Sequence, residues 1–371
     1  MKLTLLQENL KNAVSLTSHF TSPKAQLPIL GNILLKAEKS KLYLSSTNLE
    51  ISVSTSIAAK IEEEGEITIN GKILNDIVSN LNNESIEIES VQENFRITSG
   101  KFKSNLLGSN TADFPNLPTQ TGKNNFKLNK EDLINALSKV LFSVSTDETR
   151  PILTGVLFLF SNKTLKLVST DGFRLSEVKL KGEVDTNDLK IIIPKTVLYE
   201  LTKIAVDSDT IEVSFDNETN QVLFVIDDTT LSSRVIEGEF PDYEKIIPQA
   251  SIATIFVDKR EFEKAIKLAS VFARESGKIV RFKVFENKMT VSAESSSSGN
   301  QEMELEIRNI DDSPIQNEIN IMFNFSFIED ILKAVIDDEV KIIFAADNKA
   351  SKFIDSKSSN YLHIIMPIKT N

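Results

Sequence analysis

The chain has 371 residues, of which 40% are hydrophobic and 26% are charged, the balance of a soluble globular protein with two or three domains. It contains no Cys, which excludes disulfides and thiolate metal sites, and it lacks an apolar run of about 18 residues, which excludes a membrane-spanning helix. The net charge of −11 argues at first against nucleic acid as a partner, because non-specific affinity for DNA comes from neutralising phosphates. The first residues turn polar too early for a secretory signal, so we expect a cytoplasmic protein.

An amphipathic helix pattern occurs three times in the chain, each time after a strand-like segment. In each copy, four residues follow the i, i+3, i+4, i+7 spacing of a buried helix face. The three sets are Leu10, Ala13, Val14 and Thr17; Leu133, Ala136, Leu137 and Val140; and Phe262, Ala265, Ile266 and Ala269. Such regular repetition predicts three copies of one structural unit.

A hairpin and a second helix follow the first helix in every copy. Alternating residues predict hairpins over 38–47, 161–170 and 286–294. The second helices are predicted from Ile73, Leu74, Ile77, Val78 and Leu81; Val197, Leu198, Leu201, Thr202 and Ala205; and Phe327, Ile328, Ile331, Leu332 and Val335. We therefore expect an α+β fold of three repeated domains, each with two helices backed by antiparallel sheets. The expected domains span 1–122, 123–249 and 250–371.

Six short segments carry a resemblance to a known family. They are LPILGN (27–32), ADFPNL (112–117), TDGFRL (170–175), FPDY (240–243), FNFSF (323–327) and IIMPI (364–368). In this order, and over the whole chain, they resemble the bacterial sliding clamps, the beta subunits of the replicative DNA polymerase III holoenzyme. The resemblance implies a polymerase processivity factor: a head-to-tail homodimeric ring that encircles double-stranded DNA without reading its sequence, works near the nucleoid, and needs no active site or cofactor.

Helix dimensions explain why such a ring needs two chains. Helices pack with axes about 8–10 Å apart, so a circle of six leaves a lumen of roughly 6 Å, too narrow for DNA. A circle of twelve leaves roughly 23 Å, enough for a duplex with a layer of water. By resemblance, the interface joins the first domain of one chain to the third domain of the other through Ser104, Leu106, Val271 and Phe272. Plain helix core is the alternative for the last two.

The predicted helices carry both cations and carboxylates, so their excess of positive charge is modest. A ring that is held on DNA by topology requires only weak, mobile phosphate contacts and no base readout. The candidate DNA-contacting residues are Lys24, Lys72, Lys139, Lys195, Lys203, Lys264, Lys267 and Lys333. Lys24 comes from the resemblance, and a solvated helix face is the alternative for each of the others.

The resemblance also implies a pocket that binds short peptide motifs of partner proteins. Those partners are the replicative polymerase catalytic subunit, the clamp loader, repair polymerases, and mismatch-repair or ligase proteins. The implied pocket residues are Leu153, Thr170, Gly172, Phe173, Arg174, Leu175, Pro241, Lys245, Ile246, Asn324, Phe327, Ser351, Ile364, Ile365, Met366, Pro367 and Ile368. The apolar floor would consist of Leu153, Leu175, Ile246 and Ile364. Met366 would form a wall, and Arg174 would orient polar peptide atoms.

Three positions depart from the family's pattern. Phe173 stands where a His is frequent, Phe327 stands where a Tyr is frequent, and Gly277 stands where a bulky aromatic residue can line the pocket. These departures bear on the peptide preference rather than on the pocket itself.

Two other classes of function remain open from the residues alone, a carboxylate-dependent metal nuclease and a repeat scaffold that binds only proteins. The His residues are His19, expected as a cap or surface residue, and His363, expected within a strand. No phosphate-binding loop and no nucleophile elbow is present. Asp171 lies beside Arg174 without a second carboxylate at a fixed spacing, so we predict no catalytic or metal site.

Overall fold

The computed structural model describes residues 1–24, 26–82, 84–118, 124–161, 164–181, 189–204, 208–310, 314–346, 349–356 and 360–369. The boundary predicted between residues 122 and 123 lies outside the described residues, as does Ala205 of the predicted second helix. No described helix is long and apolar enough to cross a membrane.

One order of elements recurs three times, as the repeat predicts. The first copy contains β1 (Lys2–Leu6), α1 (Gln7–Ser18), η1 (Pro28–Gly31), β2 (Asn32–Glu38), β3 (Lys41–Thr47), β4 (Ile51–Ala58), β5 (Lys60–Glu63), β6 (Gly65–Asn70), α2 (Gly71–Ser79), β7 (Ser85–Val91), β8 (Asn94–Ser99) and β9 (Phe102–Leu107). The second contains β10 (Asn124–Asn129), α3 (Lys130–Val140), η2 (Leu141–Ser143), η3 (Pro151–Leu153), β11 (Gly155–Ser161), β12 (Thr164–Thr170), β13 (Arg174–Lys181), β14 (Leu189–Pro194), α4 (Lys195–Lys203), β15 (Thr210–Asp216), β16 (Gln221–Ile226) and β17 (Thr229–Arg234). The third contains β18 (Ala253–Asp258), α5 (Lys259–Ala273), β19 (Ile279–Glu286), β20 (Lys288–Ser295), β21 (Gly299–Asn309), β22 (Ile315–Asn324), α6 (Phe325–Ala334), β23 (Glu339–Phe344), β24 (Ser351–Asp355) and β25 (Tyr361–Ile365). The short helix η4 (Tyr243–Ile246) lies between β17 and β18.

The chain divides into two compact units. Unit 1 contains residues 1–130 and 196–235, and unit 2 contains residues 131–195 and 236–371. Unit 1 holds a five-stranded sheet in the order β5-β1-β7-β8-β9 and an eight-stranded sheet in the order β10-β15-β16-β17-β4-β3-β2-β6. Unit 2 holds a twelve-stranded sheet in the order β14-β11-β12-β13-β25-β24-β23-β18-β21-β20-β19-β22. The strand pairs are antiparallel, so each unit contains strands of two repeats in one continuous sheet.

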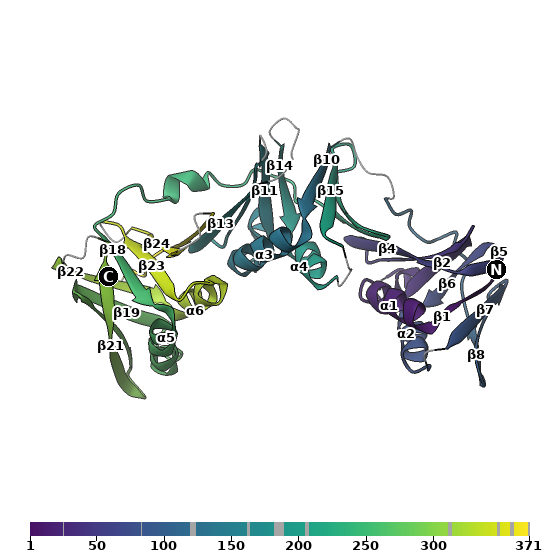
Figure 1. The fold of residues 1–371 in the computed structure, drawn as a ribbon, viewed down its shortest axis with the longest axis horizontal. Helices are drawn as coiled ribbons and strands as arrows, with labels where there is room; N and C mark the ends of the chain where they lie inside the picture. The colour runs from purple at the N-terminus through teal and green to yellow at the C-terminus, as the bar shows by residue number, and fades with distance from the viewer. Residues whose placement is uncertain are drawn as a thin grey trace. The chain divides into compact units, whose positions relative to one another are not determined.

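Helices α1 and α2 of unit 1 lie side by side against β2, β3 and β4 (Figure 1). The stripe predicted for α1 is buried, with Leu10 and Val14 at 0% exposure. The side chain of Asn70 accepts a hydrogen bond from the backbone N–H of Ile73 and begins α2. Ile73 is 49% exposed, however, so the predicted second stripe is wrong at that position, and Leu81 lies beyond the end of the helix.

A row of aromatic rings runs from helix α5 of unit 2 through β19 and β22 to β24. Phe262 of α5 contacts Phe282, which contacts Phe323, which contacts Phe353, with ring centroids 5.6, 5.3 and 5.7 Å apart. All four side chains are buried. Phe therefore supplies the large core residues in a chain that has no Trp.

The second helix of the third repeat begins with an Asn cap, as does the second helix of the first repeat. The side chain of Asn324 accepts the backbone N–H of Ser326 and begins α6. Ile328, Ile331 and Leu332 of the predicted stripe are buried, whereas Phe327 is half-buried and Val335 follows the end of the helix.

Candidate partner-binding site

A tight turn before β13 is held by its own side chains. Thr170 Oγ1 donates to the carbonyl of Arg174 at 2.6 Å, and the N–H of Gly172 donates to Thr170 Oγ1 at 3.0 Å. Asp171 Oδ1 accepts the N–H groups of Phe173 and Arg174 at 2.9 and 3.0 Å. Gly172 has φ +93°, which side chains rarely adopt. The sequence TDGFR thus fixes the turn locally, and the turn leaves Phe173 61% exposed.

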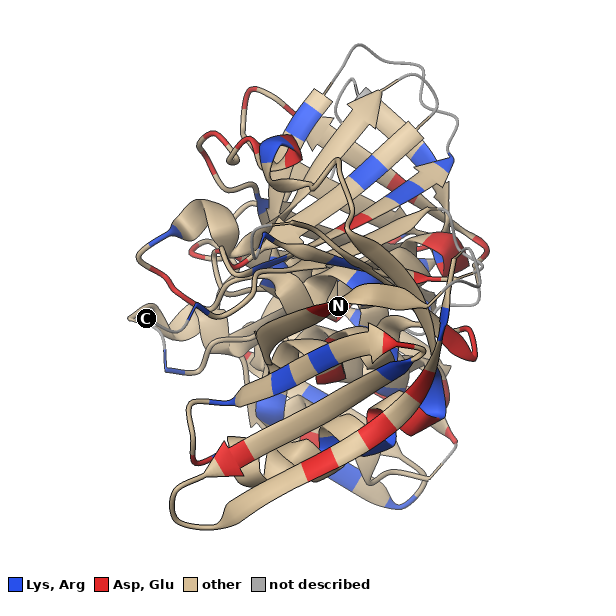
Figure 2. Cartoon of the chain, turned by 90° about the vertical axis from the view of Figure 1, so that its left-hand side faces the viewer, with Lys and Arg blue, Asp and Glu red and all other residues tan. Residues whose placement is uncertain are grey.

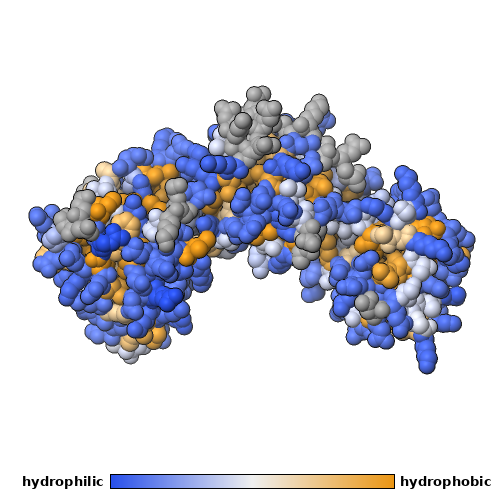
Figure 3. Space-filling view, viewed as in Figure 1, coloured by the Kyte–Doolittle hydropathy of each residue, from blue (hydrophilic) through white to orange (hydrophobic). Residues whose placement is uncertain are grey.

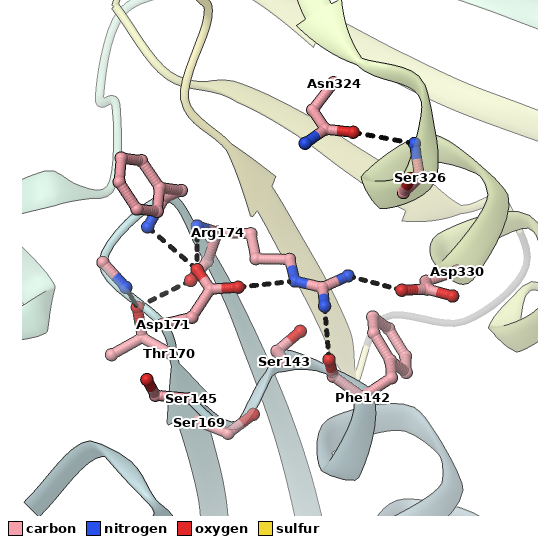
Figure 4. Close-up of polar contacts among 12 residues, drawn as sticks. Phe142, Ser143, Ser145, Ser169, Thr170, Asp171, Arg174, Asn324, Ser326 and Asp330 are labelled. Carbon is pink, nitrogen blue, oxygen red and sulfur yellow. Dashed lines mark hydrogen bonds and ion pairs between the residues drawn. The ribbon is translucent and has the colours of Figure 1, made fainter. Parts of the chain in front are cut away.

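Arg174 links this turn to two other segments of unit 2 (Figure 4). Its Nε donates to Asp171 Oδ2 at 2.9 Å, its Nη1 to Asp330 Oδ2 at 2.7 Å, and its Nη2 to the carbonyl of Phe142 at 2.6 Å. The guanidinium lies 4.5 Å from the ring centroid of Phe327. With its side chain only 10% exposed, Arg174 is a buried junction. A direct contact from Arg174 to a peptide therefore stays a prediction.

Asp330 supplies the second carboxylate that sequence spacing did not reveal. It lies 156 residues from Arg174 in the chain, so no local motif connects the two. Both Asp171 and Asp330 form ion pairs with the guanidinium. Among the described residues, no group of three or more His, Cys, Asp or Glu is arranged to hold a metal ion.

The apolar part of the site has a buried layer and an exposed layer. Leu175 faces Ile364 across the β13–β25 pair, and both belong to a buried cluster with Tyr243. Leu153 is also buried, so these three predicted floor residues lie beneath the surface.

Three apolar side chains of the predicted pocket reach solvent, and we call them the apolar rim: Phe173, Ile246 and Met366. They are 61%, 43% and 39% exposed. The N–H of Met366 donates to the carbonyl of Phe173 at 2.8 Å, and Ile246 lies in η4 beside the clustered Tyr243. Figure 3 shows scattered orange, hydrophobic areas on a largely blue, hydrophilic surface.

The other predicted pocket residues have mixed environments. Lys245 forms an exposed ion pair with Asp242 at 2.8 Å, and the N–H of Ile368 donates to the carbonyl of Met322 at 2.8 Å. Ser351 and Ile365 face each other between β24 and β25, both at 0% exposure. Pro241 is exposed and Pro367 is half-buried. Gly277, which departs from the family pattern, follows α5 with φ +72°.

His363 is a buried strand residue, as expected. Its Nδ1 lies 2.8 Å from Ser176 Oγ, and its Nε2 has no hydrogen-bond partner among the described residues. Burial, with a smaller contribution from the charge of Arg174, lowers the pKa of His363 to about 3. The ring is therefore neutral at physiological pH and cannot act as a general acid there.

This pKa predicts that stability falls with acid. Unfolded His titrates at a pKa of about 6.5, so between the two values the unfolded state binds the extra proton. The stability that neutral His363 contributes is fully present above the pKa of the unfolded state. It is lost as the pH falls below that pKa, with a slope of up to about 1.4 kcal/mol per pH unit. We expect His363→Phe to flatten the dependence of the unfolding free energy on pH between about 6.5 and 4, measured by urea denaturation. Identical slopes for the two proteins would contradict a neutral buried His363.

Comparison with known proteins identifies the family. Models of the DNA polymerase III beta subunit match residues 1–118 for the N-terminal domain, 127–242 for the central domain and 244–369 for the C-terminal domain. A beta sliding clamp of Staphylococcus epidermidis is 30% identical over 382 residues, with all of both chains covered. The chain belongs to the beta sliding clamp family. Sliding clamp structures agree in fold: that of Bacillus subtilis is 28% identical with a TM-score of 0.93, and the beta subunit of Thermotoga maritima is 25% identical with a TM-score of 0.90, each with both chains fully covered.

Membership of the clamp family confirms the expected α+β fold of three clamp domains and the expected role. The chain is a DNA polymerase processivity factor of a bacterial replication machinery and a non-catalytic accessory subunit. The metal nuclease and the protein-only scaffold are therefore set aside.

The candidate DNA-contacting residues of the clamp divide into two groups. Lys24, Lys72, Lys264 and Lys267 are exposed. Lys203 and Lys333 are also exposed, but each has an ion-pair partner: Lys203 pairs with Glu200 at 2.9 Å and Lys333 pairs with Asp330 at 3.4 Å. Lys139 is half-buried and lies over the ring of Tyr361 at 5.3 Å. Lys195 is half-buried, and burial lowers its pKa. Figure 2 shows the cations interspersed with carboxylates rather than gathered in one field.

The candidate interface residues of the clamp lie at accessible positions. Ser104 and Leu106 are half-buried on β9, the edge strand of the five-stranded sheet. Val271 is 60% exposed on α5 and Phe272 is half-buried, so plain helix core is wrong for Val271. His19 follows the last turn of α1, as expected for a residue at a helix end.

Proposed function

We propose that two copies of this clamp close head to tail into a ring around double-stranded DNA, and that the ring tethers polymerase and other partners through the apolar rim and Arg174. The three domains are assigned to residues 1–122, 123–249 and 250–371. The main support for the ring is a type of strand pairing between neighbouring repeats. It occurs twice within the chain, and the two strands that would form it a third time have unpaired edges.

The two internal junctions are built from equivalent strands. In unit 1, β4 of the first repeat pairs with β17, the last strand of the second repeat. In unit 2, β13 of the second repeat pairs with β25, the last strand of the third repeat. Both β4 and β13 follow the hairpin after the first helix of their repeat. The fourth strand of one repeat thus joins the last strand of the next.

Two strands of the same types remain without this partner. The last strand of the first repeat, β9, pairs with β8 alone among the described strands. In the third repeat, β21 pairs with β20 through residues 299–306 and meets β18 only through residues 307–309. Free strand edges are templates for pairing with another chain. If β9 of each copy pairs with β21 of the other, two identical interfaces form and no such edge stays unpaired.

The lumen of such a ring is wide enough for a DNA duplex. Six helices are described in each chain, so two chains supply the circle of twelve whose lumen of roughly 23 Å admits a duplex. The exposed Lys24, Lys72, Lys264 and Lys267 would make mobile phosphate contacts. The ring would act in the cytoplasm at the nucleoid. A mass in solution of twice the 41.4 kDa chain supports the ring, and a mass of one chain contradicts it.

The apolar rim has the chemistry of a peptide-binding site. The carbonyl of Phe173 accepts the N–H of Met366, and Arg174 fixes the turn that carries Phe173. Exposed Met and aromatic side chains adapt to different apolar residues, which suits a site shared by several partners. The proposed ligands are short motifs of the replicative polymerase, the clamp loader, repair polymerases, and mismatch-repair or ligase proteins.

Replacing Phe173 or Met366 by Ala is expected to weaken peptide binding by roughly tenfold or more, because each substitution removes exposed apolar contact area. The measurement is the affinity of a labelled peptide from the tail of the replicative polymerase. Ile336→Ala is the matched control, since Ile336 is a 78% exposed apolar residue of the same unit outside the rim. Equal affinity in all three variants would remove the rim from the binding site. Thermal unfolding should be unchanged throughout.

A further inference from the structure

We infer that one face of the sheet in the third repeat binds an acidic segment of the same partner protein whose motif is held at the apolar rim. The surface consists of six residues on four neighbouring strands, and we call it the cationic patch: Phe256, Arg308, Lys341, Ile343, Lys352 and Ile354. The inference rests on the proposed function, because the rim supplies the first anchor of that partner.

The first row of the cationic patch runs across all four strands. β21, β18, β23 and β24 are neighbours in the twelve-stranded sheet (Figure 1). Phe256 of β18 lies opposite Arg308 of β21 and opposite Lys341 of β23. Lys341 in turn lies opposite Ile354 of β24. Facing residues of paired strands point to the same side of the sheet, so these four side chains form one row in which cations and apolar groups alternate.

The second row of the patch lies two residues further along the strands. Ile343 faces Lys352 across the β23–β24 pair. The residues between the two rows, Ile342 and Phe353, point to the other face of the sheet and are buried at 0% exposure. The side chains of the patch are half-buried, apart from the exposed Arg308. The cationic patch is therefore on the face of the sheet that the hydrophobic core does not use.

Two cations of the patch have no carboxylate beside them. Arg308 donates to Glu339 at 3.1 Å, and its guanidinium lies 4.3 Å from the ring centroid of Phe256. Lys341 lies 5.7 Å from the same ring. In the part of the chain that the structure describes, neither Lys341 nor Lys352 forms an ion pair, and burial lowers the pKa of Lys352. A carboxylate that arrives beside these ammonium groups would stabilise them.

The chemistry of the patch favours an acidic peptide segment over nucleic acid. Its cations are separated by Phe and Ile side chains, so apolar contacts lie between the charges. A peptide that contains both acidic and apolar residues matches such a surface. DNA presents a phosphate at every step, and its affinity depends on how many phosphates are neutralised together.

The patch lies within reach of a peptide that is bound at the apolar rim. Lys352 of β24 faces Ile364 of β25, and β25 leads directly to Met366 of the rim. Arg308 lies on β21, four strands away from β25. Neighbouring strands are about 4.8 Å apart, so this separation is roughly 19 Å. An extended chain rises about 3.3 Å per residue, so about six residues that flank the bound motif can cover the patch.

Peptides with an acidic extension test the inference. The probe is the labelled peptide from the tail of the replicative polymerase, extended at its N-terminus or at its C-terminus by the sequence ELEELE. We expect one of the two extended peptides to bind roughly fivefold more tightly than the parent peptide at low salt, because several ion pairs form together. The extension QLQQLQ, which has no charge, should give no such gain.

Substitution of the two lysines connects the gain to the patch. Lys341→Gln with Lys352→Gln should abolish the gain and leave the affinity of the parent peptide unchanged. The matched control is Lys283→Gln with Lys288→Gln, which removes two exposed lysines from β19 and β20 of the same unit and should keep the gain. Salt of about 0.5 M should remove the gain, since it screens the ion pairs.

The outcomes separate the patch from the rim. A gain that survives Lys341→Gln with Lys352→Gln would overturn the patch. No gain from either extension, while Phe173→Ala still weakens binding of the parent peptide, would overturn the patch and leave the rim standing. An affinity for every peptide that Phe173→Ala leaves unchanged would overturn both.

Nucleic acid is the alternative occupant of the patch. A labelled single-stranded oligonucleotide should bind equally to the parent protein and to the variant with Lys341→Gln and Lys352→Gln. A weaker affinity of that variant for the oligonucleotide, with no gain from either peptide extension in the parent protein, would assign the patch to nucleic acid and contradict the inference.

Discussion

Replacing Arg174 by Ala is expected to lower the free energy of unfolding by about 3 kcal/mol and to abolish measurable peptide binding. The side chain joins Asp171, Asp330 and the carbonyl of Phe142, and it is only 10% exposed. Its removal leaves two carboxylates that are 17% and 29% exposed without their cation. The turn that carries Phe173 loses its anchor to α6 at the same time, so the apolar rim loses its shape.

Urea denaturation and peptide affinity, measured on the same preparations, test this prediction. Lys333→Ala is the control, because Lys333 is an exposed second partner of Asp330 at 3.4 Å and should change stability by less than about 0.5 kcal/mol. Arg174→Lys should recover only part of the loss, since an ammonium cannot make the three directed bonds of a guanidinium. An Arg174→Ala protein with unchanged stability and affinity would show that the network is incidental.

Replacing Ser104 by Arg is expected to convert a dimer into a monomer. The substitution puts a long cation on the free edge of β9, which the proposed ring pairs with the partner's β21. Burying an unpaired polar or charged group costs about 2 kcal/mol or more at each of two interfaces, so the dimer affinity should fall by at least a hundredfold. The mass in solution should drop to that of one 41.4 kDa chain at micromolar concentration.

The matched control is Ser85→Arg. Ser85 is an exposed Ser of β7 in the same sheet, and β7 lies between β1 and β8 rather than at the edge. This variant should keep the mass of the parent protein. If Ser104→Arg also keeps that mass, β9 does not form the interface.

The elements that repeat could be predicted from sequence because their signals are local. The stripe of α1 is a periodic pattern that burial requires, and the hairpins carry alternation and turn residues. The second stripe was less accurate, since Ile73 is 49% exposed. The short helix α2 buries a narrower face than the spacing of its apolar residues predicts, so Ile73 lies outside that face.

The contacts that organise the binding site are not local, and so the residues alone could not reveal them. Asp330 meets Arg174 across 156 residues, and the burial of Leu175 depends on pairing with Ile364. Family resemblance selected Arg174, Leu175 and Ile364 but not Asp330, and it could not say which side chains reach solvent. The half-buried position of Lys195 shows the same limit, because a local helix pattern does not reveal which tertiary neighbours will bury a lysine.

Retention on closed circular DNA distinguishes a closed ring from a protein that is held by phosphate contacts alone. The clamp is loaded onto a nicked circle with the proposed partner, a bacterial clamp loader. The complex is isolated at high salt, and half of it is cut once to give a linear molecule. We expect the clamp to stay on the circle and to leave the linear DNA, because topology rather than phosphate contact holds it. Equal retention on both forms, or equal loss from both, would contradict a closed ring around the duplex.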